Sequence, residues 1–206
     1  MPLGWTGYGE TGLGIALYAP TAWAVADHSA AGGIAAQIAA LQETLPDGVM
    51  QRVLDQALAL SADPDAAIGG DSPDRLRFVG ILPGEDNGAS YLPNVTVLVA
   101  DSQGATLPAL LNTARYELRQ TNAVTLLNAQ IVDDLRPGNR DAALLRFRQD
   151  GTARYGVPDL EIRTDQAIFL NDSQTQVAIV TLSAPAEAFA ELEETFAELI
   201  GTVLFE

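Results

Sequence analysis

The chain has 206 residues, 48% hydrophobic and 18% charged, which is typical of one globular domain with a sizeable core. Its formal net charge of −16 argues against binding to nucleic acid or to an anionic membrane surface, because both need a basic patch. The sequence contains no cysteine, which excludes disulfides, thiol chemistry and thiolate metal sites. No apolar run is long enough to span a bilayer, so we expect no transmembrane segment.

The first sixty residues predict a short β-region followed by two helices. Residues 7–12 match the G-x-G-x-x-G pattern, but a predicted strand follows them instead of preceding them, so they predict a turn-rich lead-in and not a phosphate loop. Residues 13–17 alternate apolar and small side chains, Pro20 ends that strand, and Trp23 is predicted to pack in or beside the core. Apolar residues then recur at helical spacing in two runs: Ile34, Ile38, Leu41 and Leu45, then Val49, Val53, Leu54 and Leu60.

The middle of the chain predicts mainly strands. Apolar and β-branched alternation indicates strands over 75–82, 95–99, 124–132, 142–149 and 166–170. A helix is predicted after Thr106, with Pro108 in its first turn, where proline is tolerated. The turn residues 171–173 predict a hairpin that leads into the next strand.

The clearest pattern lies at the C-terminus, which predicts strand, helix and strand. Residues 177–182 are nearly all apolar or β-branched, as in a strand that is covered on both faces. Gly201 stands where a left-handed helix cap is expected. The intervening helix places large apolar residues on one face: Phe189, Leu192, Phe196, Leu199 and Ile200. Burying each would contribute about 1.5–3 kcal/mol before entropy is counted, so we expect this helix to lie across a sheet.

These elements predict an α+β fold. Consecutive strands joined by short turns favour antiparallel pairing, and the amphipathic helices need a surface to cover. We therefore predict a single antiparallel β-sheet with helices packed on it, in one domain that spans residues 1–206.

Three segments carry a resemblance to a known family. Leu17-Tyr18-Ala19-Pro20-x-x-Trp23-x-Val25, the strand over 94–99, and the final strand, helix and strand together resemble PsbP-like domains. Members of this family include an extrinsic photosystem II protein, a nuclear-transport factor that binds the Ran GTPase, and bacterial lipoproteins. The resemblance implies an α/β/α sandwich that is not an enzyme and uses no cofactor. The two helices at about 30–60 depart from the family pattern and are interpreted as an insertion.

The only candidate metal ligands form an acidic cluster in a loop: Asp63, Asp65, Asp71 and Asp74. Calcium prefers carboxylate oxygens, but Ala67 and Ile68 break the EF-hand spacing. A solvated acidic loop is the alternative interpretation.

Other candidate chemistry is sparse, and no catalytic residue is assigned. His28 is the sole histidine, and no nucleophile-elbow motif accompanies it. The predicted last helix carries a stripe of glutamates, interpreted as a solvated face that an arginine-rich partner could read: Glu187, Glu191, Glu194 and Glu198. Asn94 and Asn171 each open a glycosylation sequon.

The leading hypothesis is a non-catalytic binding or assembly module with a protein partner, as a monomer or a dimer. The PsbP-like resemblance implies export with a leader removed, although residues 1–5 lack the features of a secretory leader; a cytoplasmic protein is the alternative. The rival function is a small-molecule or divalent-metal-binding protein, or a carboxylate-based hydrolase. Its site would lie between the sheet and the helices at 30–60.

Overall fold

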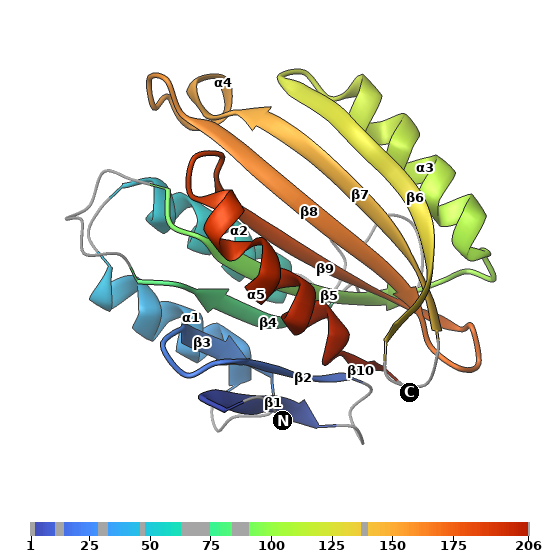
Figure 1. Cartoon of the computed structure of the whole chain (residues 1–206). Coiled ribbons are helices and arrows are strands. Elements are labelled where there is room, and N and C mark those ends of the chain that lie inside the picture. The colour runs from blue at the N-terminus through green and yellow to red at the C-terminus, as the bar shows by residue number, and fades with distance from the viewer. Residues whose placement is uncertain are drawn as a thin grey trace.

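The computed structural model describes residues 3–10, 15–28, 33–45, 48–62, 75–83, 91–136 and 140–205 (Figure 1). Within these ranges, strands and helices follow one another in this order: β1 (Trp5–Glu10), β2 (Ile15–Pro20), β3 (Ala24–Asp27), α1 (Gly33–Thr44), α2 (Val49–Ala62), β4 (Arg75–Ile81), β5 (Asn94–Asp101), α3 (Leu107–Gln120), β6 (Val124–Arg136), β7 (Arg140–Asp150), α4 (Gly151–Tyr155), β8 (Glu161–Leu170), β9 (Gln176–Pro185), α5 (Phe189–Gly201) and β10 (Leu204–Phe205). Among the described helices, none has both the length and the apolarity needed to cross a bilayer.

The described strands form two antiparallel sheets, so the prediction of a single sheet was wrong in number although right in class. The large sheet has seven strands in the order β3-β4-β5-β9-β8-β7-β6, and the small one has three in the order β1-β2-β10. Pro20 ends β2, and the Trp23 amide donates to the Pro20 carbonyl at 3.1 Å. This turn redirects the chain, and β3 consequently joins the large sheet instead of continuing the small one.

Helices cover both faces of the large sheet, which gives the predicted layered arrangement. In Figure 1, α5 crosses the front of the sheet, and α3 lies behind its β6–β8 end. Alternate residues of β5 show the division: Val95, Val97 and Val99 pack in the cluster with α5 and the small sheet, whereas Leu98 contacts the cluster under α1 and α2. Because side chains alternate along a strand, β5 contributes to a different apolar cluster on each face of the sheet.

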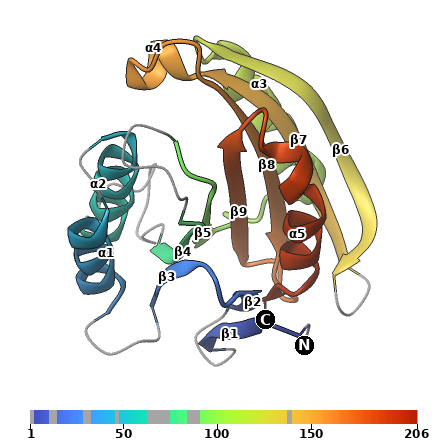
Figure 2. The same ribbon diagram turned by 60° about the vertical axis from the view of Figure 1, so that its left-hand side comes forward.

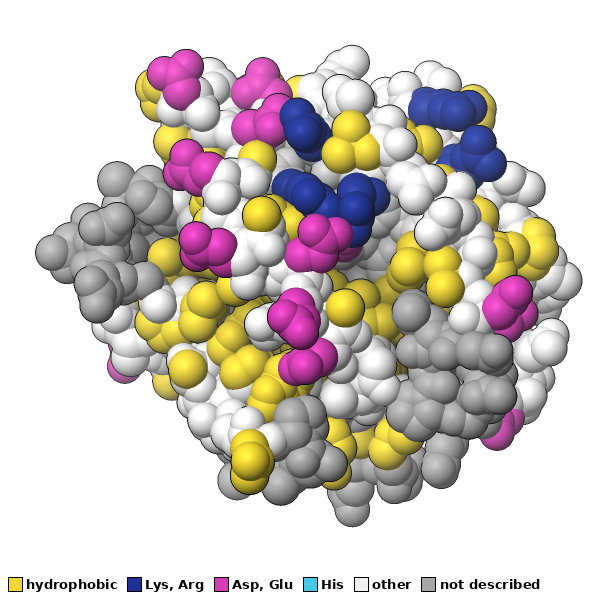
Figure 3. Space-filling view, in the orientation of Figure 1, with side chains coloured by type: hydrophobic (Ala, Val, Ile, Leu, Met, Phe, Trp, Pro, Cys, Tyr) yellow, Lys and Arg dark blue, Asp and Glu magenta, His cyan; other side chains and the backbone are white. Residues whose placement is uncertain are grey.

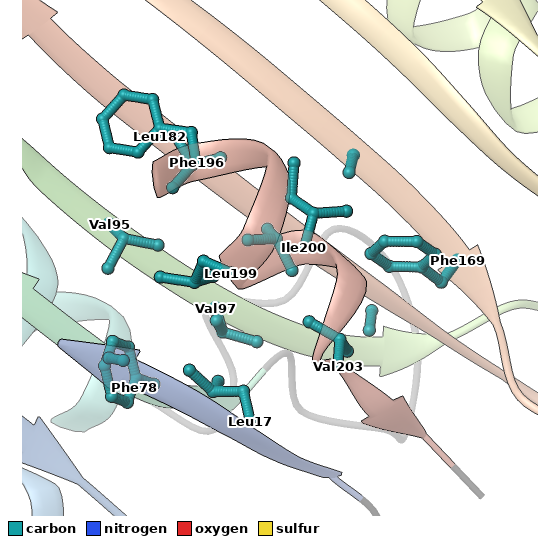
Figure 4. Packing of buried hydrophobic residues seen from close by; sticks show 14 of the residues in the cluster. Leu17, Phe78, Val95, Val97, Phe169, Leu182, Phe196, Leu199, Ile200 and Val203 are labelled. Carbon is teal, nitrogen blue, oxygen red and sulfur yellow. The ribbon is translucent and has the colours of Figure 1, made fainter. Parts of the chain in front are cut away.

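The core between α5 and the large sheet confirms the C-terminal pattern. Phe189, Phe196, Leu199 and Ile200 are buried as predicted, against β-strand residues that include Phe169 and Leu182 (Figure 4). Trp23 is only 6% exposed, and its ring meets that of Phe196 edge to face at 6.2 Å, which confirms its predicted place in the core.

The helices at 30–60 also form as predicted and cover the β3–β4 end of the large sheet. Ile38 and Leu54 are fully buried in a cluster that includes Val79 and Ile81 of β4. Gln37 of α1 closes the short edge strand β3 by bonding both backbone groups of Asp27. Its amide nitrogen donates to the Asp27 carbonyl at 2.7 Å, and its amide oxygen accepts from the Asp27 amide at 3.3 Å.

Three local predictions were wrong. The glycine-rich lead-in contains a strand, β1, whose pairing with β2 brings Gly9 so close to Ile15 that a Cβ would lie 2.5 Å from its carbonyl oxygen. The short helix α4 was missed; the Asp150 side chain caps it by accepting from two amides. Gly201 is the last residue of α5 and not a left-handed cap, because Thr202 continues in the right-handed region.

Candidate functional site

A concave feature with mixed polar and apolar lining is a cleft of about 200 Å³ between α5 and the β6–β8 end of the large sheet. Strand side chains and one flank of α5 line it: Asn128, Gln130, Leu144, Leu145, Arg146, Asp165, Gln166, Glu193, Phe196, Ala197 and Ile200. Figure 3 shows arginine and acidic side chains side by side over the upper part of this face, with apolar surface below them. We refer to this feature as the α5 cleft.

A bidentate ion pair forms the charged wall of the α5 cleft. Register places Arg146 of β7 directly opposite Asp165 of β8. The guanidinium donates to both carboxylate oxygens, from Nη2 to Oδ2 at 2.8 Å and from Nε to Oδ1 at 3.0 Å. The hydrogen bonds to Asp165 raise the pKa of Arg146 above its ordinary value, and the charges of Asp165 and Glu193 add to this effect. Two parallel bonds fix the plane of the guanidinium as one bond would not.

Glu193 connects the ion pair to α5. Its Oε1 accepts from Arg146 Nη2 at 2.8 Å and from Arg163 Nη2 at 3.3 Å. The Arg163 guanidinium also lies over the Phe189 ring, 4.0 Å from its centroid, in a cation–π contact. Two arginines and two carboxylates therefore meet in one neutral network on a chain whose net charge is −16.

The members of this network differ in exposure. The side chains of Arg146 and Glu193 are 39% and 48% exposed, whereas those of Asp165 and Arg163 are 19% exposed. An ion pair as open to water as that of Arg146 and Glu193 typically contributes about 0–1 kcal/mol, because solvent screens the two charges and their side chains lose freedom. Their charges can consequently re-pair with an incoming group at small cost, while Phe196 and Ile200 supply an apolar floor. The arrangement suits recognition better than it suits folding.

None of the sequence-predicted site residues that the structure describes lines the α5 cleft. The acidic cluster of Asp63, Asp65, Asp71 and Asp74 lies outside the described residues. Among those that are described, no three His, Asp or Glu side chains are grouped so that they could hold a metal ion. His28 directly follows β3 and is half-buried. Its Nδ1 lies 3.1 Å from the Arg77 carbonyl oxygen, so its side chain has a structural contact there.

The remaining candidate residues have structural explanations. The glutamates at 187, 191, 194 and 198 are exposed, as a solvated face requires. Asn94 and Asn171 are 4% and 7% exposed, so neither sequon presents its asparagine to an enzyme in the folded chain. Between the sheet and the helices α1 and α2, where the rival site was expected, the described residues form an apolar cluster.

Sequence reasoning missed the α5 cleft for an identifiable reason. Arg146 and Asp165 meet only because β7 and β8 pair in one particular register. Glu193 lies outside the predicted glutamate stripe and had no visible partner. The available signal was weak: in β7 an arginine alternates with apolar residues, and β8 carries Arg163 and Asp165 two residues apart.

Comparison with known proteins agrees with the predicted resemblance in fold. No family model matches the sequence, and no curated protein matches it. The chain is similar to the solution structure of cyanobacterial PsbP (CyanoP) from Synechocystis sp. PCC 6803, with a TM-score of 0.52 and 14% identity. The match covers 100% of this chain and 95% of that one. The chain therefore has a PsbP-like fold, and at this identity the likeness concerns the fold alone.

Proposed function

We propose that the protein is a non-catalytic binding module that docks a protein partner in the α5 cleft. The observation that supports this most is the network of Arg146, Asp165, Glu193 and Arg163 above an apolar floor. Arginine and aromatic side chains beside a desolvated pocket are the composition of binding hot spots. The partner would insert an apolar side chain between Phe196 and Ile200 and present charged groups to Arg146 and Glu193.

The size of the α5 cleft favours a protein partner over a small ligand. Pockets for drug-sized molecules measure about 300–1,000 Å³, whereas this cleft encloses about 200 Å³. That volume suits one inserted side chain, with further contacts made on the surrounding surface. The second candidate is a small anion held by Arg146, because its guanidinium reaches the cleft. Asp165 and Glu193 already accept hydrogen bonds from arginines, so a metal or hydrolytic role has less support.

We also propose that the module works outside the cytoplasm. This rests on the PsbP-like resemblance, and the cytoplasm is the alternative compartment. The natural N-terminus of the full gene product tests it: a lipobox or secretory leader supports export, and its absence there contradicts export.

The binding proposal is tested by affinity purification of the tagged chain from its natural host, with Arg146→Ala and Arg148→Ala as a matched pair. Both arginines lie on β7, but Arg148 pairs with Glu161 outside the α5 cleft. We expect the wild type and Arg148→Ala to recover the same partner, and Arg146→Ala to recover at least about tenfold less, a loss of about 1.4 kcal/mol.

Two outcomes would contradict the proposal. One is recovery of no partner by the wild type, together with robust turnover on a panel of hydrolase substrates. The other is equal recovery by both variants. Calorimetry with acetate and inorganic phosphate tests the second candidate: saturable binding that Arg146→Ala abolishes would favour the small anion.

A further inference from the structure

The two edges of the large sheet are built differently. β3 at one edge has four residues, and Gln37 occupies the amide and carbonyl of Asp27. β6 at the other edge has thirteen residues and pairs only with β7 among the described strands. Figure 2 shows β6 along the outer rim of the curved sheet, with no ribbon beyond it. An edge of this length presents a row of backbone donors and acceptors that only another extended chain can match.

The first nine residues of β6 lack the usual devices that keep sheet edges apart, and charged residues occur in the strand only from Asp133 onward. Residues 124–132 read VTLLNAQIV, with no charge, proline or glycine. Leu127 and Ile131 are 45% and 38% exposed, two of the few large apolar side chains that the described surface presents. Protected edges typically carry lysine, proline or inward-pointing charges, or are very short. The pairing of β6 with β7 has two register shifts, one between Leu126 and Asn128 and one between Val132 and Arg136, and only the first falls within 124–132.

We propose that β6 pairs antiparallel with β6 of a second copy of this chain, which joins the two large sheets across a two-fold axis. Self-pairing suits this strand because no register within 124–132 brings like charges opposite one another. The other edge argues for a closed dimer: β3 is short and closed by Gln37, so the sheet can grow in one direction only. An isologous contact between identical edges then ends the assembly at two copies.

The net charge does not oppose this contact strongly. Each copy carries a formal charge of −16, but at physiological salt the Debye length is about 8 Å, so charges remote from the β6 edge are largely screened. The interface is small, and we expect a weak, concentration-dependent dimer. It goes beyond the proposed partner binding, because the contact is made by the outer backbone edge of β6, whereas the same strand contributes the side chains of Asn128 and Gln130 to the α5 cleft.

Sedimentation of the full chain from about 5 to about 500 µM, a range in which a weak dimer is populated, tests the proposal. The disrupting variant is Leu127→Lys with Ile131→Lys, and the control is Tyr116→Lys on α3, a residue that is 67% exposed. We expect the wild type and the control to dimerise alike, and the double variant to associate at least about tenfold more weakly. Because lysines reduce the net negative charge, a loss of association cannot come from greater overall repulsion.

Hydrogen exchange of the wild type at the two ends of this concentration range locates the contact independently of any variant. Amides within 124–132 should become protected as concentration rises, and those of β3 and β1 should not change. A wild type that is monomeric throughout would overturn the proposal. So would dimerisation that the double variant retains, or protection that develops elsewhere. If the double variant fails to fold, the exchange pattern of the wild type decides alone.

Discussion

The two ends of the large sheet differ in how their edge strands and faces are covered. At the β3–β4 end, α1 and α2 bury a continuous apolar cluster, and Gln37 closes the short edge strand. At the β6–β8 end, the long strand β6 pairs only with β7 among the described strands, and the half-exposed charges of Arg146 and Glu193 line the α5 cleft. The β3–β4 end of the sheet is thus covered by helices of the same chain, whereas the β6–β8 end is available for contact with another molecule.

The difference shows where the fold places its stability. Buried apolar area contributes roughly 25 cal/mol per Å², so the apolar cluster under α1 and α2 stabilises the β3–β4 end. The half-exposed ion pair of Arg146 and Glu193 contributes about 0–1 kcal/mol. This pair can consequently open to an incoming group without unfolding the protein. The apolar packing at the β3–β4 end therefore does not depend on the ion pairs at the β6–β8 end.

The largest expected effect comes from truncating one apolar side chain at each end. Leu54→Ala should lower the free energy of unfolding by about 2–5 kcal/mol, because the Leu54 side chain of α2 is fully buried and the change leaves a cavity. Leu127→Ala on β6 should change it by only about 0.5 kcal/mol, since Leu127 is 45% exposed. Urea denaturation at low protein concentration measures both. Equal losses of unfolding free energy in the two variants would contradict the proposed difference between the two ends of the sheet.

A pH effect of intermediate size should come from Tyr91, which packs against Tyr155 at the covered end. Burial, followed by the charge of Tyr155, raises the pKa of Tyr91 to about 12. The unfolded phenol ionises near pH 10, so the unfolded state loses its proton first and stability falls as the pH rises from about 10 to 12. The loss attributable to Tyr91 should total about 2–3 kcal/mol.

Comparison of Tyr91→Phe with Tyr116→Phe isolates this contribution. In Tyr91→Phe, the free energy of unfolding should fall less between pH 10 and 12 than in the wild type. In Tyr116→Phe it should fall as in the wild type, because Tyr116 is exposed. Denaturation series at several pH values provide the measurement. The interpretation of Tyr91 as a buried neutral phenol is wrong if both variants follow the wild-type curve.

The smallest expected effect concerns the closed edge. Gln37→Ala should cost about 1 kcal/mol, the typical net value of a hydrogen bond in a folded protein, and should speed exchange of the Asp27 amide. Gln130→Ala on the open edge should change neither quantity, because Gln130 is exposed. Unchanged exchange at Asp27 would show that Gln37 does not close β3.

Much of the fold could be predicted because hydrophobic periodicity reports burial directly. Phe189, Phe196 and Leu199 repeat with the helical period, and β9 is apolar on both faces as a covered strand requires. The second sheet could not be predicted. Its strands β2 and β10 lie almost the full chain length apart, and the pairing of Ile15 with Phe205 leaves no local signal.

The α5 cleft was hidden from sequence reasoning for the same kind of reason. Spacing along one helix or strand indicates neighbours three, four or two residues apart. Arg146 reaches Asp165 across strands, and both charges reach Glu193 only after α5 has docked. Acidic residues that stand close in sequence, such as Asp63 and Asp65, drew attention instead. Charges brought together by tertiary register were the more informative set.

Photo-crosslinking in the natural host tests the central claim most directly, with a benzophenone side chain placed at Ala197 or at Ala39. Ala197 is exposed and lines the α5 cleft, whereas Ala39 is exposed on α1 at the covered end. The account predicts one discrete protein adduct from Ala197, none from Ala39, and loss of the Ala197 adduct when Arg146 is changed to alanine. No adduct at Ala197, or the same adduct from both positions, would contradict it.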